Sequence, residues 1–599
     1  MTTVPRRLAA CAAARPDDIA CLTADGSRLT YRAWDQRATR VARAMRLHGA
    51  APGERIAIVT QTSEWLEYAI AYVAAQRAGC IAVPVPADGG TAYREWAVER
   101  AGAVAFVDTG PDRRVQAASW SATLAELEGA GGEQTDGPGP RDAVALDAGA
   151  APDDPAEILR TSGTTGGPKC VVASHANVLA AHAASDARAD RARHVLHCLP
   201  AATTAGQGLL VLPLHPAPHT VITLGQFDPA AFFSAIERHR PTDVVLVPAL
   251  AIALIEAFAP DTWDLGSVRL VRTTSAPIAP ATLARLDVLF PGAATVNMYS
   301  STEAWPARTR LRFDPTRPGS VGRPAAGSSL RIVDADGRAV GPGEVGEVQL
   351  RAEGAPQRRY EGDDEASERV FLADGWVRTG DVGRLDADGF LHLLDRSSDL
   401  LNVGGVNVAS LEVEAALHEH DAVVEAAVVG LPHPLLGERV AAAVRLARDV
   451  PAAELRAFVE HRLGAAPTPA TIAVVDELPR NAAGKVLKPA LRSQLLAAAR
   501  SAPSAPPATA TERTVARVWL SVLDVEDVGR GDGFLDLGGS SLSALEAIAL
   551  VGEALGVETT VRDLFESETL EAYAERLERA PAAAADPAPP IERQPRGTR

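Results

Sequence analysis

A short loop between residues 159 and 169 carries the kinds of groups that bind phosphate. It reads Leu-Arg-Thr-Ser-Gly-Thr-Thr-Gly-Gly-Pro-Lys and follows an apolar stretch that is typical of a strand. Glycines let main-chain N–H groups approach an oxyanion, hydroxyl side chains add donors, and a lysine adds positive charge. The candidate phosphate-binding residues are Thr161, Ser162, Gly163, Thr164, Thr165, Gly166 and Lys169. The alternative interpretation is a hairpin turn rich in glycine and threonine.

A second polar group follows apolar residues near position 296, where the chain reads Val-Asn-Met-Tyr-Ser-Ser-Thr-Glu. A strand that ends here would deliver Tyr299, Thr302 and Glu303 together. Mg²⁺ prefers hard oxygen ligands and usually takes one or two carboxylates besides phosphate oxygens, so Glu303 is the candidate metal ligand. The alternative is that Glu303 is a carboxylate in the first turn of a helix capped by Thr302.

Three further charged residues lie in glycine-containing turns of the second half of the chain. Asp381 in Thr-Gly-Asp could accept the two hydroxyls of a ribose, and Arg396 in Asp-Arg could approach ribose or phosphate. Lys485 follows a glycine in a loop, which suits a charge that is inserted for one step and withdrawn later. The alternatives are a simple turn for Asp381, a local ion pair for Arg396 and a solvated lysine for Lys485.

The elements that must position these residues alternate between strand and helix patterns. Residues 55–59 are typical of a strand, residues 65–79 of a helix and residues 80–84 of a further strand. Such alternation predicts a parallel sheet covered on both faces. Open α/β sheets bind ligands where strands end at their carboxyl edge, although ordinary turns are the alternative at each position. The candidate substrate-pocket residues at such ends are Thr203, Thr204, Val247, Thr274 and Ser275.

A small helical unit follows a linker near the end of the sequence. Residues 501–510 are rich in proline and alanine, which predicts a semi-rigid linker. Residues 511–580 contain four helical segments, with apolar residues spaced for a buried stripe. Ser541 precedes one of these helices, and the free N–H groups of a helix N-terminus suit a phosphodiester. The alternative for Ser541 is an N-cap serine, and the tail 581–599 is predicted to be disordered.

The length, charge and cysteine content of the chain limit the classes of protein to which it can belong. At 599 residues the chain is too long for one core. A formal net charge of −17 argues against nucleic acid and anionic membranes as partners. The five cysteines are scattered and odd in number, which argues for reduced thiols and against a disulfide framework or a structural zinc site. No signal peptide or membrane-spanning run is recognised, so a cytoplasmic location is expected.

The order of these motifs resembles the adenylate-forming superfamily, which includes acyl-CoA synthetases, firefly-type luciferases and adenylation domains of nonribosomal peptide synthetases. Thr-Ser-Gly-Thr-Thr-Gly-x-Pro-Lys is similar to its phosphate loop, and Tyr-x-x-Thr-Glu, Thr-Gly-Asp, Asp-Arg and Gly-Lys follow in the family's order. Residues 534–542 resemble the motif of acyl and peptidyl carrier domains. The sequence departs from the family pattern at Cys170, Ser300 and Ser398, where the family usually has Gly, Gly, and Asp or Lys.

The resemblance implies a multidomain α/β protein that binds ATP, Mg²⁺ and 4′-phosphopantetheine. It implies a large N-terminal adenylation subdomain at 1–395, a small mobile α+β subdomain at 396–500, the linker 501–510 and an all-α four-helix carrier domain at 511–580. In the family, Tyr299 would lie near adenine, Glu303 would hold Mg²⁺ and Lys485 would contact the carboxylate and the α-phosphate. Ser398 falls at the hinge about which the small subdomain rotates, and Ser541 falls at the attachment site of phosphopantetheine.

The function implied is activation of a carboxylic acid as an acyl adenylate, followed by transfer to a carrier thiol. Amino-acid-activating relatives have an aspartate for the α-ammonium where this chain has Ala202-Thr203, so an acid without an α-amino group is predicted. The expected role is a loading didomain of a nonribosomal peptide or polyketide assembly line, as in antibiotic biosynthesis. Expected partners are a phosphopantetheinyl transferase and a downstream condensation or ketosynthase enzyme. The alternatives are an acyl-CoA ligase, an amino-acid-activating didomain, or a non-enzymatic carrier with an inactive adenylation fold.

Overall fold

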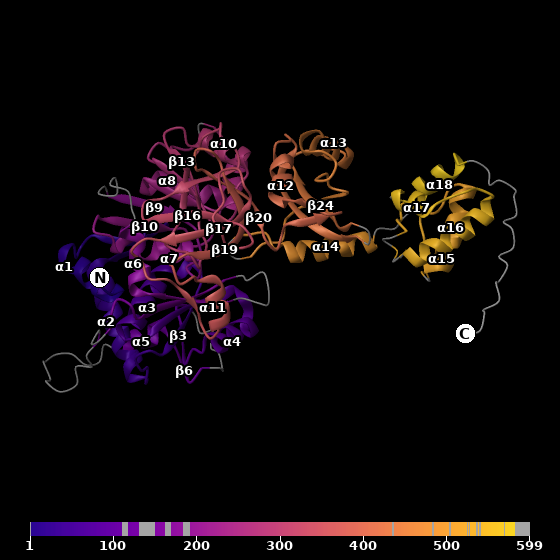
Figure 1. Ribbon diagram of the computed structural model, residues 1–599. Helices are drawn as coiled ribbons and strands as arrows, with labels where there is room; N and C mark the ends of the chain where they lie inside the picture. The colour runs from indigo at the N-terminus through magenta and orange to yellow at the C-terminus, as the bar shows by residue number, and fades with distance from the viewer. Residues whose placement is uncertain are drawn as a thin grey trace, which may run out of the picture. The chain divides into compact units, whose positions relative to one another are not determined.

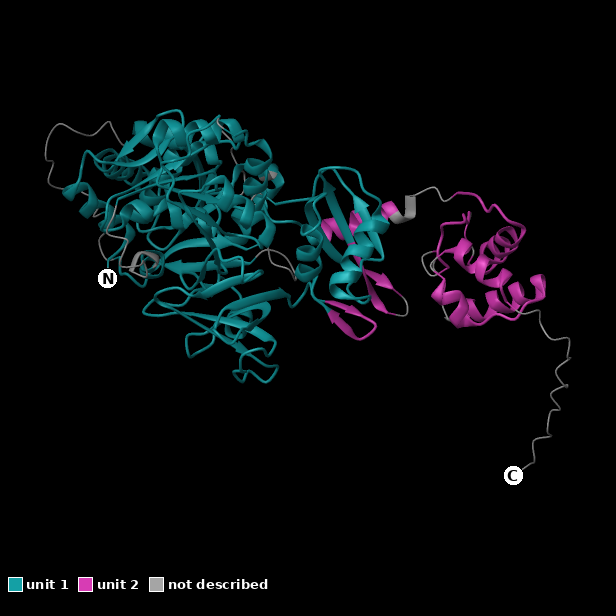
Figure 2. Ribbon diagram, turned by 90° about the horizontal axis from the view of Figure 1, so that it is seen from above, with its two compact units in different colours: residues 1–400, 408–429, 442–488 teal, residues 401–407, 430–441, 489–599 magenta. Residues whose placement is uncertain are grey.

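The computed structural model describes residues 2–110, 118–130, 146, 150–161, 169–183, 192–260, 262–433, 436–481, 484–501, 505–523, 525, 527–534, 537, 539, 541–567 and 569–580. For residues 89, 181–183, 499–501 and 541 it describes the backbone alone. The chain forms two compact units, coloured separately in Figure 2. One consists of residues 1–400, 408–429 and 442–488, and the other of residues 401–407, 430–441 and 489–599.

A large mixed sheet forms the centre of the first unit (Figure 1). Its strands are β1 Ile19–Thr23, β2 Arg28–Thr30, β9 Arg193–His197, β10 His219–Thr223, β11 Asp243–Leu246, β12 Leu270–Thr273, β13 Ala294–Tyr299, β14 Thr309–Arg312, β15 Ser320–Pro324, β16 Ser328–Val333, β17 Gly346–Ala352, β19 Val377–Leu385 and β20 Leu391–Arg396. Their order among the described residues is β16-β17-β19-β20-β15-β14-β13-β12-β11-β9-β10-β1-β2. The neighbours from β13 to β1 pair in parallel, and the flanking strands pair antiparallel.

The parallel part of this sheet is buried, as the apolar sequence of its strands requires. Every residue of β11 is buried, and a parallel sheet covered by helices favours such continuous apolar runs. The covering helices include α8 Pro229–His239, α9 Pro248–Ala257 and α10 Pro280–Leu289. Phe232, Phe233 and Leu286 from these helices join β11 in one apolar cluster. This packing fixes the positions of the strand ends. The candidate pocket residues lie at or after these strand ends.

A second sheet contains the strands that flank the phosphate-binding loop. It consists of β3 Arg55–Thr60, β4 Ile81–Pro86, β5 Ala105–Asp108, β6 Trp120–Thr123, β7 Pro155–Arg160, β8 Cys170–Ser174 and β18 Arg359–Tyr360. Its order is β18-β8-β7-β4-β3-β5-β6. Helix α3, Trp65–Arg77, is apolar around almost its whole circumference and is buried in the main core of this part. The sheet therefore holds the two ends of the loop on a packed support.

The N-terminal strands divide between the two sheets, which the local pattern did not predict. Strand β1 pairs with β10, with Cys21 opposite Val221, whereas β3 to β6 belong to the second sheet. The alternation of strand and helix predicts a parallel sheet but not which strands share it. That choice depends on partners far away in the sequence.

The third sheet follows Arg396 and belongs to the small subdomain. It consists of β21 Leu401–Val403, β22 Val406–Val408, β23 Val423–His433, β24 Gly437–Leu446 and β25 Thr471–Val474. Its order is β22-β21-β24-β23, and β25 pairs with β24. Helices α12 Ser410–His418 and α13 Ala452–Leu463 pack against each other and bury apolar side chains such as Val413, Leu417 and Leu455.

The C-terminal helical unit has its own core. Helices α15 Ala510–Leu523, α16 Ser541–Leu555, α17 Val561–Glu566 and α18 Leu570–Glu578 surround a cluster of buried aromatic rings. The ring of Trp519 meets that of Phe534 edge-on at 5.2 Å between centroids and stacks on Tyr573 at 6.2 Å. The predicted four-helix unit is confirmed, because the apolar stripe on each helix has a partner in this cluster.

The remaining helices connect or cover these layers. They are α1 Val4–Ala14, α2 Tyr31–Leu47, α4 Gly90–Ala101, α5 Leu124–Ala130, α6 His175–Ala183, α7 Thr204–Leu210, α11 Asp364–Val370 and α14 Lys488–Ser501, with the 3₁₀ helices η1 Thr62–Glu64, η2 Ala87–Gly89 and η3 Leu212–Leu214. Within the part of the chain that the structure describes, no helix has the length and apolar character needed to cross a bilayer.

Candidate active site

The phosphate-binding loop is held at its base by two antiparallel strands. Arg160 on β7 pairs with Cys170 on β8, and the N–H of Thr161 donates to the carbonyl of Lys169 at 2.9 Å. The two ends of the loop are therefore brought together. A phosphate-binding loop and a simple hairpin turn would both have this arrangement. The other predicted phosphate ligands lie outside the described residues: Ser162, Gly163, Thr164, Thr165 and Gly166.

Lys169 and Glu303 share one neighbour, the side chain of Tyr360. The Nζ atom of Lys169 lies 4.5 Å from the centre of the Tyr360 ring, a cation–π contact. The Tyr360 hydroxyl donates to Oε1 of Glu303 at 3.1 Å. Burial, together with the negative charge of Glu303, raises the pKa of Tyr360 far above its ordinary value, so the phenol stays a donor. Sequence reasoning missed Tyr360, because it lies on a two-residue strand without a local pattern.

Tyr299, Asp381 and Arg396 form a second cluster: Tyr299 and Arg396 end the strands β13 and β20, and Asp381 lies in the middle of β19. Asp381 on β19 lies opposite Arg396 on β20, and the Arg396 Nε lies 3.5 Å from Oδ1 of Asp381. The Tyr299 hydroxyl donates to Oδ2 of Asp381 at 2.6 Å. Burial raises the pKa of Asp381, while the charge of Arg396 and the bond from Tyr299 act against that rise. Both oxygens of this carboxylate therefore have fixed neighbours.

Lys485 belongs to this second cluster electrostatically, although it is far away in the sequence. Its pKa is lowered to about 8 because the side chain is largely buried, and the charge of Arg396 acts in the same direction. The charge of Asp381 opposes this shift. The loop turns at Gly484, whose φ of +78° favours glycine, and a Cβ there would lie 3.1 Å from Cγ2 of Val247. Val247, a predicted pocket residue, thus borders the loop that carries Lys485.

An ion-pair network anchors this loop to helix α9. Arg445 binds both carboxylate oxygens of Glu256, with both contacts at 2.9 Å, and its Nε donates to Glu425 at 3.0 Å. Arg480 also pairs with Glu425 and donates to the carbonyl of Gly484 at 2.8 Å. Bidentate arginine–carboxylate pairs fix orientation as well as distance. The loop that carries Lys485 is therefore tied to α9 through Glu256, near the C-terminal end of that helix.

The lowered pKa of Lys485 predicts a pH dependence. We expect kcat/KM for the acid to fall as pH rises through about 8, because Lys485 then loses its proton and its charge. Because the pKa of Lys485 is lowered, this loss of activity occurs at a lower pH than it would for a lysine with an ordinary pKa. The measurement is a pH profile of pyrophosphate release between pH 6.5 and 9.5. Lys485→Arg is the control, since a guanidinium keeps its charge throughout. A wild-type profile that stays flat across pH 8 would contradict the prediction.

The segment that carries Glu303 is a set of turns. Residues 302–306 are not helical, so the alternative of a helix capped by Thr302 is wrong. Instead the Oγ1 of Thr302 lies 2.7 Å from the Oγ1 of Thr204 on α7. Ser301 closes the turn, because its Oγ accepts the N–H of Ala304 at 3.1 Å. Glu303 is thus held beside α7 by side-chain contacts rather than by a helix.

The five predicted pocket residues differ in what they contact. The Oγ1 of Thr203 caps α7 by accepting the N–H of Gly206 at 3.1 Å and donates to the carbonyl of Pro200 at 2.8 Å. Thr274 follows β12, and its N–H donates to the carbonyl of Leu246 at 3.2 Å. Ser275 is exposed and has a φ of +76°, which is uncommon for serine. The hydroxyl of Thr203 therefore already makes hydrogen bonds to the main chain.

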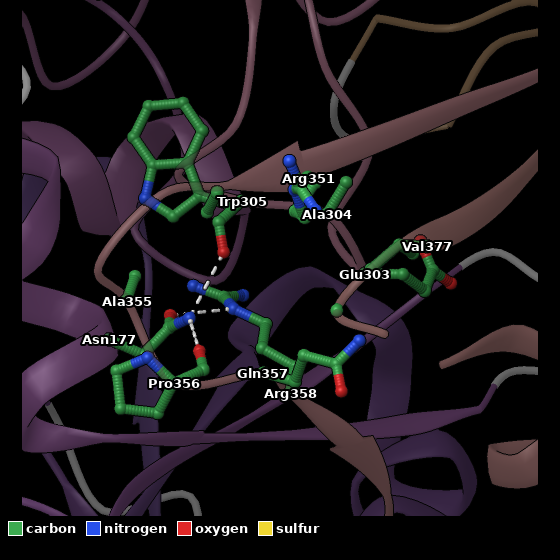
Figure 3. Close-up of a pocket in the computed structure, with 12 residues that line it drawn as sticks. Asn177, Glu303, Ala304, Trp305, Arg351, Ala355, Pro356, Gln357, Arg358 and Val377 are labelled. Atoms are coloured by element: carbon green, nitrogen blue, oxygen red, sulfur yellow. Dashed lines mark hydrogen bonds between the residues drawn. The ribbon is translucent and has the colours of Figure 1, made fainter. Parts of the chain in front are cut away.

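A buried charged network lies directly behind this segment (Figure 3). The Nη1 of Arg358 donates to the carbonyl of Thr302 at 3.1 Å, and its Nε donates to Oδ1 of Asn177 at 2.9 Å. Its Nη2 lies 3.9 Å from Oε1 of Glu157, and each of these two side chains is only 1% exposed. Oε2 of Glu157 accepts the Tyr72 hydroxyl at 2.8 Å. Sequence reasoning did not identify Arg358, which borders a cavity of about 70 Å³ beside Glu303.

Removing this buried cation is expected to destabilise the protein. Arg358→Met leaves Glu157 without its counter-ion, and breaking a buried pair costs about 3–5 kcal/mol. Denaturant unfolding of the single variant measures this cost. The double variant Arg358→Met/Glu157→Gln is the matched control, and it should recover much of the loss because no unpaired charge remains. Equal stability of the single variant and the wild type would contradict the prediction.

The two remaining predicted residues lie outside the main cluster. Ser398 is exposed in the segment after β20, and its hydroxyl donates to Oδ1 of Asp399 at 3.0 Å. Ser541 is the first residue of α16, a helix of 15 residues in the C-terminal helical unit. A helix of this length presents free N–H groups at its start, which suits an anionic group on Ser541.

Comparison with known proteins identifies the family. The profile described as AMP-binding enzyme matches residues 8–355, and that of the AMP-binding enzyme C-terminal domain matches residues 412–485. The profile of the phosphopantetheine attachment site matches residues 513–577. The chain therefore belongs to the AMP-binding enzymes and carries a phosphopantetheine attachment domain. The predicted superfamily, the fold and the ATP and phosphopantetheine cofactors are thereby confirmed.

Individual relatives are similar over most of this chain. A feruloyl-CoA synthase from Amycolatopsis sp is 32% identical over 485 residues, which cover 78% of this chain and 94% of that protein. The phosphinothricin tripeptide synthetase PhsB from Streptomyces viridochromogenes is 29% identical, over 97% of this chain and 50% of that protein. The structure of ATP-bound MatB from Rhodopseudomonas palustris superposes with a TM-score of 0.73 at 28% identity, over 82% of this chain and 98% of that one. The chain is accordingly an AMP-forming carboxylate ligase.

Proposed function

We propose that this chain is the loading didomain of a natural-product assembly line. It activates a carboxylic acid without an α-amino group as an acyl adenylate and transfers the acyl group to its own carrier domain. The observation that supports this proposal is that one chain contains both the cluster of Lys485, Asp381 and Arg396 and a phosphopantetheine attachment domain at 513–577. A free acid–thiol ligase needs no such domain.

In the first step a carboxylate oxygen of the acid attacks the α-phosphorus of ATP, and the bond to pyrophosphate breaks. Charge builds on the α-phosphate oxygens, and Lys485 would offset that charge. Asp381 would accept the ribose hydroxyls, Arg396 would contact ribose or phosphate, and Tyr299 would lie near adenine. The loop that ends at Lys169 would hold the β- and γ-phosphates. Positioning and electrostatics then supply most of the catalysis.

The surroundings of Glu303 fit a magnesium ion. One carboxylate oxygen accepts the Tyr360 hydroxyl, and the other accepts no hydrogen bond from the described residues. That free oxygen is the hard ligand that Mg²⁺ prefers, with phosphate oxygens completing the shell. When bound, Mg²⁺ would neutralise part of the triphosphate charge. Tyr360 would orient the carboxylate.

In the second step the small subdomain would rotate about Ser398 and withdraw Lys485. Ser541 would hold phosphopantetheine, whose thiol would accept the acyl group while the bond to the AMP oxygen breaks and the thiol proton is lost. Ser398 is exposed and its hydroxyl donates to the neighbouring Asp399, so it would offer little resistance to the dihedral change that a hinge requires.

The absence of a charge at Ala202 and Thr203 supports an acid without an α-amino group. Neither side chain is ionisable, and the Thr203 hydroxyl is already bonded to Pro200 and Gly206. An α-ammonium buried there would lack a counter-ion. ATP–pyrophosphate exchange with a panel of carboxylic and amino acids tests this proposal. Strong exchange with a proteinogenic amino acid, and none with simple acids, would overturn it.

Two relatives favour different alternatives. Similarity to a feruloyl-CoA synthase favours release of an acyl-CoA, and similarity to the tripeptide synthetase PhsB favours an amino-acid-loading didomain. Incubation with a free pantetheine thiol, in competition with the modified carrier domain, separates the first alternative from loading in cis. Partners under the proposal are a phosphopantetheinyl transferase and a downstream condensation or ketosynthase enzyme that accepts the thioester.

A further inference from the structure

Two main-chain carbonyls flank Glu303, and each accepts a hydrogen bond from a buried side chain. The Nη1 of Arg358 donates to the carbonyl of Thr302 at 3.1 Å, one residue before Glu303. The Nδ2 of Asn177 donates to the carbonyl of Trp305 at 3.2 Å, two residues after Glu303. This segment consists of turns rather than a helix, so its backbone depends on such individual bonds. The two side chains therefore hold the main chain on both sides of Glu303.

These two side chains are also joined to each other. The Nε of Arg358 donates to Oδ1 of Asn177 at 2.9 Å, and the Nδ2 of Asn177 also donates to the carbonyl of Pro356 at 2.8 Å (Figure 3). Asn177 and the side chain of Arg358 are each only 1% exposed. Hydrogen bonds from a guanidinium are strong, and a buried setting strengthens them further. We call Arg358 and Asn177 the carbonyl clamp.

The segment that carries Arg358 also orients the side chain of Glu303. Arg358 and Tyr360 are buried, whereas Arg359 between them is exposed. Side chains two residues apart in an extended segment point to the same side. Arg358 contacts the main chain of the turn, and the Tyr360 hydroxyl donates to the Glu303 carboxylate at 3.1 Å. One short segment thus contacts both the backbone beside Glu303 and its carboxylate.

We propose that the carbonyl clamp, Arg358 and Asn177, positions Glu303 to bind Mg²⁺. This inference rests on the proposed function, in which Glu303 holds the Mg²⁺ ion of Mg·ATP. The groups that orient a metal ligand contribute to metal affinity, and removing one of them typically costs about 10- to 100-fold. Arg358 and Asn177 act through the backbone of Glu303, so they are positioning residues rather than metal ligands.

A simpler role for Arg358 would be to balance the charge of Glu157. Its Nη2 lies 3.9 Å from Oε1 of Glu157. The two roles use different nitrogen atoms of the guanidinium, because Nε and Nη1 make the hydrogen bonds to Asn177 and to the turn. Replacing both charged residues removes the charge-balancing role from the comparison. The loss of the clamp can then be measured in a protein that has no unpaired buried carboxylate.

The test measures nucleotide binding to the full chain rather than turnover. The nucleotide is α,β-methylene-ATP, which cannot release pyrophosphate, and its dissociation constant is measured by isothermal titration calorimetry with Mg²⁺ and again with EDTA. The ratio of the two constants is the gain in affinity that Mg²⁺ provides. We expect Arg358→Met/Glu157→Gln to reduce this gain by about tenfold or more. Its affinity in EDTA should equal that of the wild type, whereas a general loss of structure would weaken binding under both conditions.

Two further variants guard against indirect effects. Arg358→Lys keeps a cation opposite Glu157, but its single ammonium cannot reproduce the forked geometry of the guanidinium, so it should also lose the Mg²⁺ gain. The matched control is Arg77→Met/Asp35→Asn. It removes another buried arginine with its carboxylate partner, in helices α3 and α2, where Nη2 and Oδ1 lie 2.7 Å apart. The Mg²⁺ gain of this control should equal that of the wild type.

If both Arg358 variants keep the full Mg²⁺ gain, the positioning role is wrong and Arg358 only balances the charge of Glu157. Equal weakening with Mg²⁺ and with EDTA, or the same loss in the control variant, would overturn the positioning role as well. A wild type that gains no affinity from Mg²⁺ would do so too. Failure of the proposed function has a different signature, because no acid would then support pyrophosphate exchange whatever the nucleotide affinities are.

Discussion

Replacing Lys485 with alanine is expected to slow adenylate formation by about 100- to 1,000-fold, the usual cost of removing one group that stabilises transition-state charge. The side chain lies near Asp381 and Arg396, and its loop is anchored through Arg480 and Arg445 to Glu256. Under the proposed mechanism, its charge would offset the charge that builds on the α-phosphate. The measurement is single-turnover formation of acyl adenylate from ATP and the acid.

The same variant should lose much less activity in the second step. When acyl adenylate is supplied directly, Lys485→Ala should form thioester at nearly the wild-type rate, because the proposed rotation removes this lysine from the site. Lys488→Ala is a matched control on the same segment, since Lys488 pairs with Glu414 at 3.1 Å and does not carry the proposed role. Equal loss in both half-reactions would refute the assignment of Lys485 to adenylation alone.

Replacing Ser541 with alanine is expected to abolish loading while adenylation continues. Ser541 begins α16, and its hydroxyl is the proposed attachment point for phosphopantetheine. Without that hydroxyl no phosphodiester can form, so no thiol is present to accept the acyl group. Intact-protein mass after incubation with a phosphopantetheinyl transferase and CoA measures attachment, and a second spectrum with ATP and acid measures loading.

The neighbouring serine provides the control for this experiment. Ser540→Ala should keep the mass gain, because the Ser540 hydroxyl is not the proposed attachment point. A mass gain that survives Ser541→Ala, or that disappears in Ser540→Ala alone, would place the attachment elsewhere. ATP–pyrophosphate exchange by Ser541→Ala should equal that of the wild type, because the first step uses no thiol.

Local patterns in the sequence predicted the elements well but not their partners. The alternation before residue 150 predicts a parallel sheet, yet β1 and β2 join one sheet and β3 to β6 another. Strand pairing is decided by contacts such as Cys21 with Val221, which no window of sequence contains. The four C-terminal helices, by contrast, follow from their own spacing, because each buries its apolar stripe within a short stretch of chain.

The residues of the candidate active site also fall into those that the sequence predicts and those that only the structure identifies. Glycine, hydroxyl and charged residues in ordered motifs made Lys169, Glu303, Asp381 and Lys485 candidates from the sequence alone, since such chemistry needs particular side chains. Their neighbours Tyr360 and Arg358 come from segments without a recognisable pattern. The role of a tyrosine on a two-residue strand depends on contacts with residues far away in the sequence.

The sequence by itself determined which reaction class this protein belongs to, because a reaction class requires particular functional groups in a particular order along the chain. Only the tertiary structure decided how Glu303 is oriented and how Lys485 is anchored. Those properties depend on distances between segments far apart in the chain, and burial and packing fix such distances after folding.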